Sequence, residues 1–239
     1  MAAPRASLGG PLVSRRSDPV PAALRRLLEQ LGEVGATREF YLAGGTGLAL
    51  VLAHRRSVDL DFFSRTNRLD FVGRRALLAR LRRLPRWTLV EARDGTVHGR
   101  VGPVRVSFFW YDEPLVKPLI RRGSLRIASL EDLGLMKLGA IVGRGSRKDF
   151  VDLYAICHAV PLPRLLTLSR RKFTDARDFI LQTLKALSFF EDADREPPVV
   201  AASPLAWDRV KAFFDQEARR LARRYLSTSG RLSRRRPAD

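Results

Sequence analysis

The stretch from Tyr41 to Phe63 reads YLAGGTGLALVLAHRRSVDLDFF, and it decides the fold. Phe40 to Ala43 is short and apolar, which predicts a buried strand, and Gly44-Gly45 ends it. The next residues, Thr46 to His54, read as a helix, and Val58 to Phe63 alternates in the manner of a second strand. A strand, a glycine turn, a helix and a further strand indicate a mixed α/β arrangement.

The second strand carries two acidic residues, Asp59 and Asp61. Side chains alternate across a strand, so Val58, Leu60 and Phe62 are expected in the core while the two carboxylates share the other face, about 6.5 to 7 Å apart. Like charges so placed repel unless a cation sits between them, and oxygen ligands of this kind suit Mg²⁺ that also holds substrate phosphates. Two solvated aspartates on an exposed face would give the same pattern.

The turn Gly44-Gly45-Thr46 lies between the first strand and the helix. Its backbone N–H groups and the helix N-terminus are able to cradle an anion, although an ordinary glycine-rich turn has the same composition. Both the turn and the aspartate pair belong to strands expected to be neighbours. A phosphate cradle and a metal-binding carboxylate pair would then meet at one edge of the sheet, which suits phosphoryl or nucleotidyl transfer.

Two later helices each carry an isolated charge. Lys137 is the only charge in the run from Leu133 to Val142, and Asp152 is the only full charge between Phe150 and Val160. The two residues stand at similar distances from the turn around Gly145, so an antiparallel helix pair would place them at one height. They form either a structural salt bridge or a cationic phosphate contact with its orienting carboxylate. Four charged residues at the turn belong either to this site or to a solvated loop: Arg144, Arg147, Lys148 and Asp149.

The remaining pattern predicts an α+β chain whose second half is helical. Further strands are expected at Trp87 to Ala92, Thr96 to Val101 and Val104 to Tyr111, and further helices at Pro21 to Val34, Phe71 to Leu84, Leu130 to Arg144, Phe150 to Val160, Thr174 to Asp192 and Pro204 to Leu226. We divide the chain into a disordered basic arm (1–20), an α/β core (21–128), a helical region that completes the active site (129–228) and a basic tail (229–239).

Composition limits the classes of partner. The formal net charge is +19, from 44 basic and 25 acidic residues, which favours a polyanion such as nucleic acid, although 38 of the basic residues are Arg and genome composition alone could produce that skew. The candidate polyanion surfaces are 65–86 and 204–239, with Arg74, Arg75, Arg82 and Arg234 to Arg236 as the candidate RNA contacts. The longest apolar run has 12 residues, the single cysteine is Cys157 and the three histidines are scattered, so we expect no membrane span, no disulfide, no structural zinc and a cytoplasmic location.

Two blocks, YLAGGTGLALVLAHRRSVDLDFF and MKLGAIVGRGSRKDFVDLYAI (136–156), resemble the AbiEii/AbiGii toxin family of the nucleotidyltransferase superfamily. The first is similar to the superfamily pattern of paired glycines, a spacer and Asp-x-Asp, here with 13 residues between Gly45 and Asp59. The resemblance covers about 38–160 and implies a polymerase-β-like nucleotidyltransferase core with Mg²⁺ and an NTP as cofactors. It also implies nucleotide addition to RNA such as tRNA, opposed by a cognate antitoxin protein.

Roles follow from the resemblance residue by residue. Asp59 and Asp61 would hold Mg²⁺. The turn Gly44-Gly45-Thr46 would take the triphosphate, Arg56 and Lys137 would neutralise it, and Asp152 would position Lys137 or the acceptor hydroxyl.

The chain departs from the superfamily pattern at one place. A third carboxylate is common on a later strand, here Val104 to Tyr111, but no acid faces the aspartate pair and Ser107 is the expected occupant. That duty then falls to Asp152 or Asp149, or the reaction is slow.

Three functions from different classes stay open. The leading one is an RNA-directed nucleotidyltransferase toxin. The second is a nucleotidyltransferase that acts on a small molecule or a protein, and a cavity too narrow for RNA would support it. The third is a non-catalytic nucleic-acid-binding relative, which would bind Mg-NTP without turnover.

Overall fold

The computed structural model describes residues 20–233, with side chains as far as Tyr225. The helices in the described part are α1 (Ala22–Glu33), α2 (Gly44–Leu52), α3 (Phe71–Leu81), α4 (Leu130–Gly143), α5 (Arg147–Cys157), α6 (Leu162–Lys172), α7 (Ala176–Ala186), α8 (Glu191–Arg195) and α9 (Trp207–Ser233). The strands are β1 (Tyr41–Leu42), β2 (Leu60–Ser64), β3 (Trp87–Arg93), β4 (Thr96–Val101), β5 (Val104–Trp110), β6 (Ile120–Arg122) and β7 (Leu125–Ile127).

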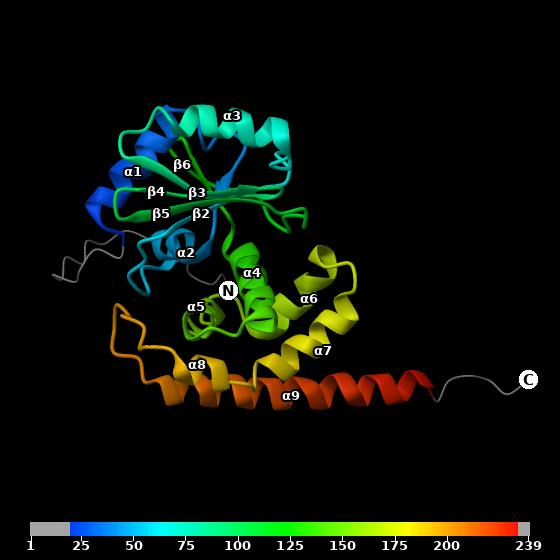
Figure 1. The fold of residues 1–239 in the computed structure, drawn as a ribbon. Coiled ribbons are helices and arrows are strands. Elements are labelled where there is room, and N and C mark those ends of the chain that lie inside the picture. Colours follow the sequence, from blue (N-terminus) through cyan, green and yellow to red (C-terminus); the bar gives the residue numbers. More distant parts are fainter. Residues whose placement is uncertain (1–19, 234–239) are drawn as a thin grey trace, which may run out of the picture.

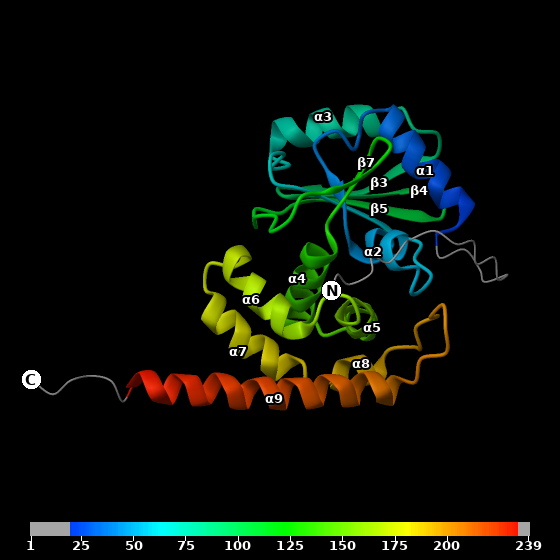
Figure 2. The ribbon, with the colours of Figure 1, turned by 180° about the vertical axis from the view of Figure 1, so that it is seen from behind.

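The strands form one mixed sheet in the order β3-β4-β5-β2-β1-β7-β6. The pairs β2–β5 and β1–β7 are parallel, and the remaining neighbours are antiparallel. Helices α1 and α3 cover one face of the sheet, whereas α2 lies on the opposite face beside the helical half of the chain (Figures 1 and 2). The chain is therefore α+β, a mixed sheet with flanking helices followed by a helical region.

The face of the sheet under α1 and α3 holds the core of the first half. Leu60 and Phe62 of β2 lie beside Val106 and Phe108 of β5, and all four are fully buried. The rings of Phe62 and Phe108 stack with centroids 5.1 Å apart, and Phe40 meets Phe108 edge-on at 5.0 Å. Since alternate residues point the opposite way, this burial fixes Asp61, Phe63, Ser107 and Phe109 on the other face.

The second half packs around α4 and α5, with α9 running along its outer side (Figure 1). Phe150 of α5 is fully buried against the rings of Phe190, Trp207 and Phe214. This aromatic cluster holds α5 against α8 and α9. The position of α5 matters because this helix carries Asp149 and Asp152.

Most of the elements expected from sequence are confirmed, with ends that differ by a few residues. Two short strands, β6 and β7, were not predicted, because three residues joined by a turn at Gly123 (φ +59°) show no alternation. Helix α6 was also missed. Its first turn contains Pro163, a position where proline costs a helix little.

Two expectations are wrong. Val58 is 49% exposed and lies outside the core, because β2 begins only at Leu60. In place of the single helix expected over Thr174 to Asp192, the structure has two helices, α7 and α8, and residues 187–190 connect them. The predicted arm is outside the described residues but for Val20, and the tail beyond Ser233 is outside them altogether.

Within the described part of the chain, no single helix has both the length and the apolar character that a bilayer span requires. Helices α5 and α6 reach that threshold only when they are joined, and they meet at a bend of 108°.

The alternation of β5 gives a test of the fold. Phe108→Ala should lower the free energy of unfolding by about 3–5 kcal/mol, because it leaves a cavity between Phe40 and Phe62. Phe109→Ala, one residue along, removes a half-buried ring from the opposite face and should cost clearly less. Urea denaturation of both variants measures the difference, and equal losses would contradict this assignment of the two faces.

Candidate active site

A cavity of about 610 Å³ lies between the sheet and α4. Six of the residues predicted from the sequence line it: Gly44, Gly45, Arg56, Asp59, Asp61 and Lys137. Two others do not reach it. Thr46 lies beneath the glycine turn, and Asp152 lies behind Lys137.

The glycine turn needs glycine at both positions. Gly44 has φ +60°, and a Cβ built on it would lie 2.6 Å from an Asp61 carboxylate oxygen. A Cβ on Gly45 would lie 2.5 Å from the Arg55 guanidinium and 2.9 Å from the Ser57 hydroxyl. Any side chain here would fill the space between the N-terminus of α2 and the aspartates, so the turn keeps its backbone open to a ligand.

The side chain of Thr46 points into the protein beneath the glycine turn. It is buried, and its hydroxyl lies 2.5 Å from the Asp59 carbonyl oxygen and 2.9 Å from the Ser57 hydroxyl. Its side chain thus holds the loop before β2 in place. Any contact of Thr46 with a phosphate would be made by its backbone.

The two aspartates that line the cavity differ in their position relative to β2. Asp61 belongs to β2, whereas Asp59 lies just before this strand. Burial raises the pKa of the Asp61 carboxyl, and the neighbouring charge of Asp59 raises it further. A bound cation would relieve both penalties, which is the physical reason to regard this pair as a metal site.

Lys137 is buried between two carboxylates of α5. Its Nζ lies 2.8 Å from Asp149 Oδ1 and 2.6 Å from Asp152 Oδ2. Burial alone would lower the pKa of the ammonium, but the charges of Asp152 and Asp149 outweigh it and the pKa is raised. The predicted pairing of Lys137 with Asp152 is therefore confirmed, and the lysine is charged.

Asp149 is not part of a solvated loop. It is fully buried and accepts hydrogen bonds from Arg144 Nε at 2.8 Å and Ser146 Oγ at 2.7 Å as well as from Lys137. The sequence could not settle this point, because a helix N-terminus with several charges looks the same whether it faces water or a buried lysine.

Arg55 is the principal residue that sequence reasoning missed. It is buried, and its Nε and Nη2 form a bidentate pair with the Asp152 carboxylate at 2.5 and 2.9 Å. His54 Nε2 lies 2.5 Å from the same carboxylate. Arg56, which the sequence favoured, is exposed at the cavity. Adjacent arginines before an Asp-x-Asp motif do not reveal which one turns inward.

The loop before β2 also forms backbone hydrogen bonds with a segment distant in sequence, residues 200–202. Arg56 N–H donates to the Val200 carbonyl, and Ala202 N–H donates to the His54 carbonyl at 2.8 Å. Arg55 forms an isolated antiparallel bridge with Ala201. The segment before α9 therefore fixes the residues that position Asp152.

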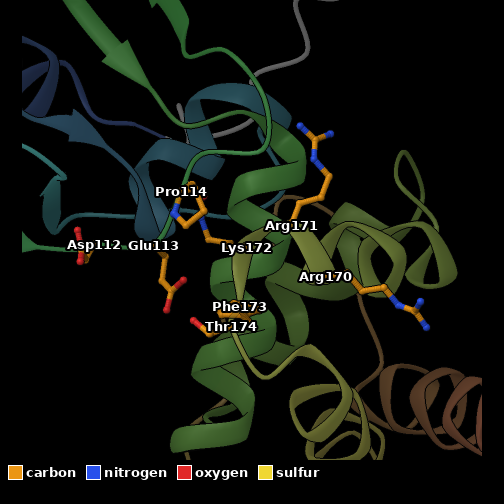
Figure 3. A pocket seen from close by; sticks show the side chains of 8 residues that line it. All are labelled: Asp112, Glu113, Pro114, Arg170, Arg171, Lys172, Phe173 and Thr174. Carbon is orange, nitrogen blue, oxygen red and sulfur yellow. The ribbon is translucent and has the colours of Figure 1, made fainter.

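The far end of the cavity is aromatic. Phe63 and Phe109 stack with centroids 5.0 Å apart, and Tyr111 meets Phe63 edge-on at 5.8 Å. Glu113 and Phe173 line this end and also line a second cavity of about 380 Å³. Figure 3 shows that Arg170 and Arg171 of this second cavity extend away from Glu113, so their side chains form no anion cradle there.

The first predicted basic surface, 65–86, lies away from this cavity. Helix α3, which carries Arg74 and Arg75, covers the opposite face of the sheet (Figure 2). Arg74 is paired with Asp94. Residues 234–236 are outside the described range. Contacts of these arginines with RNA stay a prediction.

Comparison with known proteins adds independent findings. Residues 26–225 match the profile of the nucleotidyl transferase AbiEii toxin of type IV toxin–antitoxin systems. The uncharacterised protein aq_aa25 of Aquifex aeolicus is 34% identical over 200 residues, which cover 82% of this chain and 94% of that protein. Among solved structures, JHP933 from Helicobacter pylori aligns with a TM-score of 0.51 at 17% identity, over 87% of this chain and 94% of its own. ANT(2")-Ia, solved with adenylyl-2"-tobramycin, aligns with a TM-score of 0.50 at 14% identity, over 66% and 97%. At these identities the structural likeness shows the fold.

The buried ion cluster predicts a strong effect of one substitution. Lys137→Met leaves two buried carboxylates without their central cation and should lower the free energy of unfolding by about 3–5 kcal/mol. Lys148→Met removes an exposed lysine at the same cavity and should change it little. Denaturation of both variants measures this, and an unchanged Lys137→Met would show that the cluster does not stabilise the fold.

The same cluster predicts how stability depends on pH. Burial would raise the pKa of Asp149, but the Lys137 charge and the hydrogen bonds from Arg144 and Lys137 lower it from 3.8 to about 2. A carboxyl with a depressed pKa in the folded state stabilises above its unfolded pKa, and this contribution is lost as the pH falls from about 4 towards 2. The melting temperature should drop over this range. Asp149→Asn should start lower at pH 5 and lose less on acidification; an equal loss in both proteins would contradict the assignment.

Proposed function

Because this chain belongs to the AbiEii nucleotidyl transferase toxin family of type IV toxin–antitoxin systems, we propose that it moves a nucleotide from an NTP to an RNA acceptor, with tRNA as the first candidate, in a Mg²⁺-dependent reaction. One observation carries the proposal. The glycine turn, the two aspartates and Lys137 converge on one cavity although 92 residues lie between Gly44 and Lys137 in the sequence. A backbone anion cradle, a carboxylate pair and a fixed cation are the parts that phosphoryl transfer requires.

The residues fit a magnesium ion. Asp59 and Asp61 offer hard oxygen ligands, and burial together with the neighbouring charge of Asp59 raises the pKa of Asp61, a penalty that a bound cation would relieve. The described residues contain no cluster of three or more His, Cys, Asp or Glu side chains able to hold a metal. Two protein ligands suit Mg²⁺, which keeps water and substrate phosphate oxygens in its remaining positions. A bound Mg²⁺ would neutralise negative charge on the phosphates.

The protein's own groups account for triphosphate binding. The backbone N–H groups at Gly44 and Gly45 begin α2 and point their partial positive charge at the cavity. Lys137 enters from α4 as a fixed cation, and Arg56, Arg144 and Lys148 line the cavity. Asp149 and Asp152 hold Lys137 in one place, so its charge is arranged before the substrate arrives.

The charge of the chain and the aromatic end of the cavity support RNA as the acceptor. The net charge of +19 favours a polyanion, and the aromatic end of the cavity offers rings on which a base can stack. Membership of a type IV system implies an antitoxin as the counterpart of this chain. A reaction between an NTP and RNA would take place in the cytoplasm.

Substitution of the aspartates tests this function. Asp59→Asn and Asp61→Asn should each reduce transfer of label from an α-³²P NTP to total tRNA at least 100-fold in the presence of Mg²⁺, because the metal loses a charged ligand. Removing one of two repelling carboxylates should leave the melting temperature unchanged or raised. Asp208→Asn, on the exposed start of α9, is the matched control and should transfer as the unaltered protein does.

Each outcome of this experiment has a meaning. Label on aminoglycoside or protein acceptors in place of RNA would contradict the proposed acceptor. Binding of Mg-NTP with no transfer to any acceptor would contradict enzymatic action, and undiminished transfer by the Asp59→Asn, Asp61→Asn double variant would remove the metal assignment.

A further inference from the structure

A row of polar side chains crosses the sheet on the face that carries the cavity. Asp61 of β2 is in register with Ser107 of β5, Ser107 with His98 of β4, and His98 with Glu91 of β3. The Ser107 hydroxyl lies 3.0 Å from His98 Nδ1, and the imidazole packs edge-on against Phe109 with centroids 5.3 Å apart. A serine–histidine pair thus lies directly beside a carboxylate of the candidate metal site.

Nucleotide transfer requires that the acceptor hydroxyl lose its proton. Glu113 lines the far, aromatic end of the cavity, and the carboxylates around the glycine turn and Lys137 already have other partners. Asp59 and Asp61 are the proposed metal ligands. Asp149 and Asp152 are tied into the cluster around Lys137, where charge and hydrogen bonds hold the pKa of both well below the usual range. Imidazole is the side chain best suited to accept a proton near neutral pH.

The serine–histidine pair also lies where an acceptor strand could approach. Ser107 is buried beside two residues that line the cavity: Asp61, opposite it on β2, and Phe109, two residues further along β5 on the same face. On the same face, Arg100 and Arg105 are in register across β4 and β5, and both are exposed. Like charges directly opposite each other destabilise a sheet, so this arginine pair favours an anion such as an acceptor phosphate.

We propose that Ser107 and His98 form a proton relay for the acceptor hydroxyl; this inference rests on the function proposed above. The acceptor oxygen forms a bond to the α-phosphorus of the NTP, and the bond from that phosphorus to the pyrophosphate oxygen breaks. The proton of the acceptor hydroxyl passes to Ser107 Oγ, whose own proton passes to the neutral His98 Nδ1. The imidazolium then releases its proton to water after pyrophosphate has left. Ser107 touches the acceptor, while His98 acts through it and is a positioning residue.

The charges around His98 define its electrostatic setting. Glu91 faces it from β3 and is itself paired with Arg93 at 3.2 Å. Arg100 precedes the turn on the same strand, Arg105 faces from β5, and Asp61 lies one strand further. The row therefore contains both signs of charge. The relay requires a neutral imidazole to accept the proton, so transfer should increase with pH.

Four variants test the relay in single-turnover transfer to tRNA at saturating NTP. His98→Gln and Ser107→Ala should each lower the rate about 100-fold at neutral pH, within the range of a lost general base. Ser107→Asp placed in the His98→Gln background should recover at least tenfold, with its pH dependence moved to lower pH, because a carboxylate replaces the relay. Thr96→Val, two residues from His98 on the same face of β4, is the control and should keep both rate and pH profile.

The outcomes separate this inference from the proposed function. If the unaltered protein transfers nucleotide while His98→Gln keeps its rate and pH profile, the relay is overturned and the function stands. A slow His98→Gln that Ser107→Asp fails to recover also overturns the relay, since a structural role for His98 would give that result. If the unaltered protein transfers nothing, the proposed function fails and the relay fails with it. Loss in both single variants with recovery and a shifted pH profile in the double variant supports the relay.

Discussion

The structure depends on the contacts of one buried carboxylate, that of Asp152, with Lys137, Arg55 and His54. Lys137 comes from α4, and Arg55 and His54 come from the loop before β2, so one carboxylate joins the helical half of the chain to the sheet. All of these groups are removed from water, and a buried charge without its partners is costly. The two halves can therefore adopt only the relative position in which these charges meet, and that position also closes the cavity between α4 and the aspartates of the sheet.

The cavity places a glycine turn and two mutually repelling carboxylates close together. The glycine turn must come close to Asp61, so it cannot carry a side chain. Asp59 and Asp61 must stay near each other although their charges repel. The Thr46 hydroxyl donates a hydrogen bond to the Asp59 carbonyl oxygen and so helps to hold Asp59 in this position. The rigid elements around the site thus hold two repelling carboxylates close together, an arrangement that a bound cation would stabilise.

The sequence predicted the fold class and the main features of the site because both have local signals. Alternation around Leu60 and Phe62 marked a strand with two acids on one face, and the isolated charges Lys137 and Asp152 in apolar helices indicated a pair. Features that depend on the relative placement of distant segments could not be predicted. The inward turn of Arg55 in place of Arg56 follows from its contacts with α5 and with the segment before α9. The burial of Asp149 follows from its contacts with Lys137 and Arg144. The hydrogen bond between Ser107 and His98 depends on the register of β4 against β5, and the sequence pattern of neither strand predicts that register.

The bridge between Arg55 and Ala201 has a consequence for the synthesis of the protein. Loop residues near 55 leave the ribosome long before residues near 201, and the loop completes its backbone hydrogen bonds only with that late segment. A nascent chain therefore carries the glycine turn and both aspartates but no finished site. For a toxin this delay separates the synthesis of these residues from activity, because the loop before β2 is completed only after the segment near residue 201 has been made.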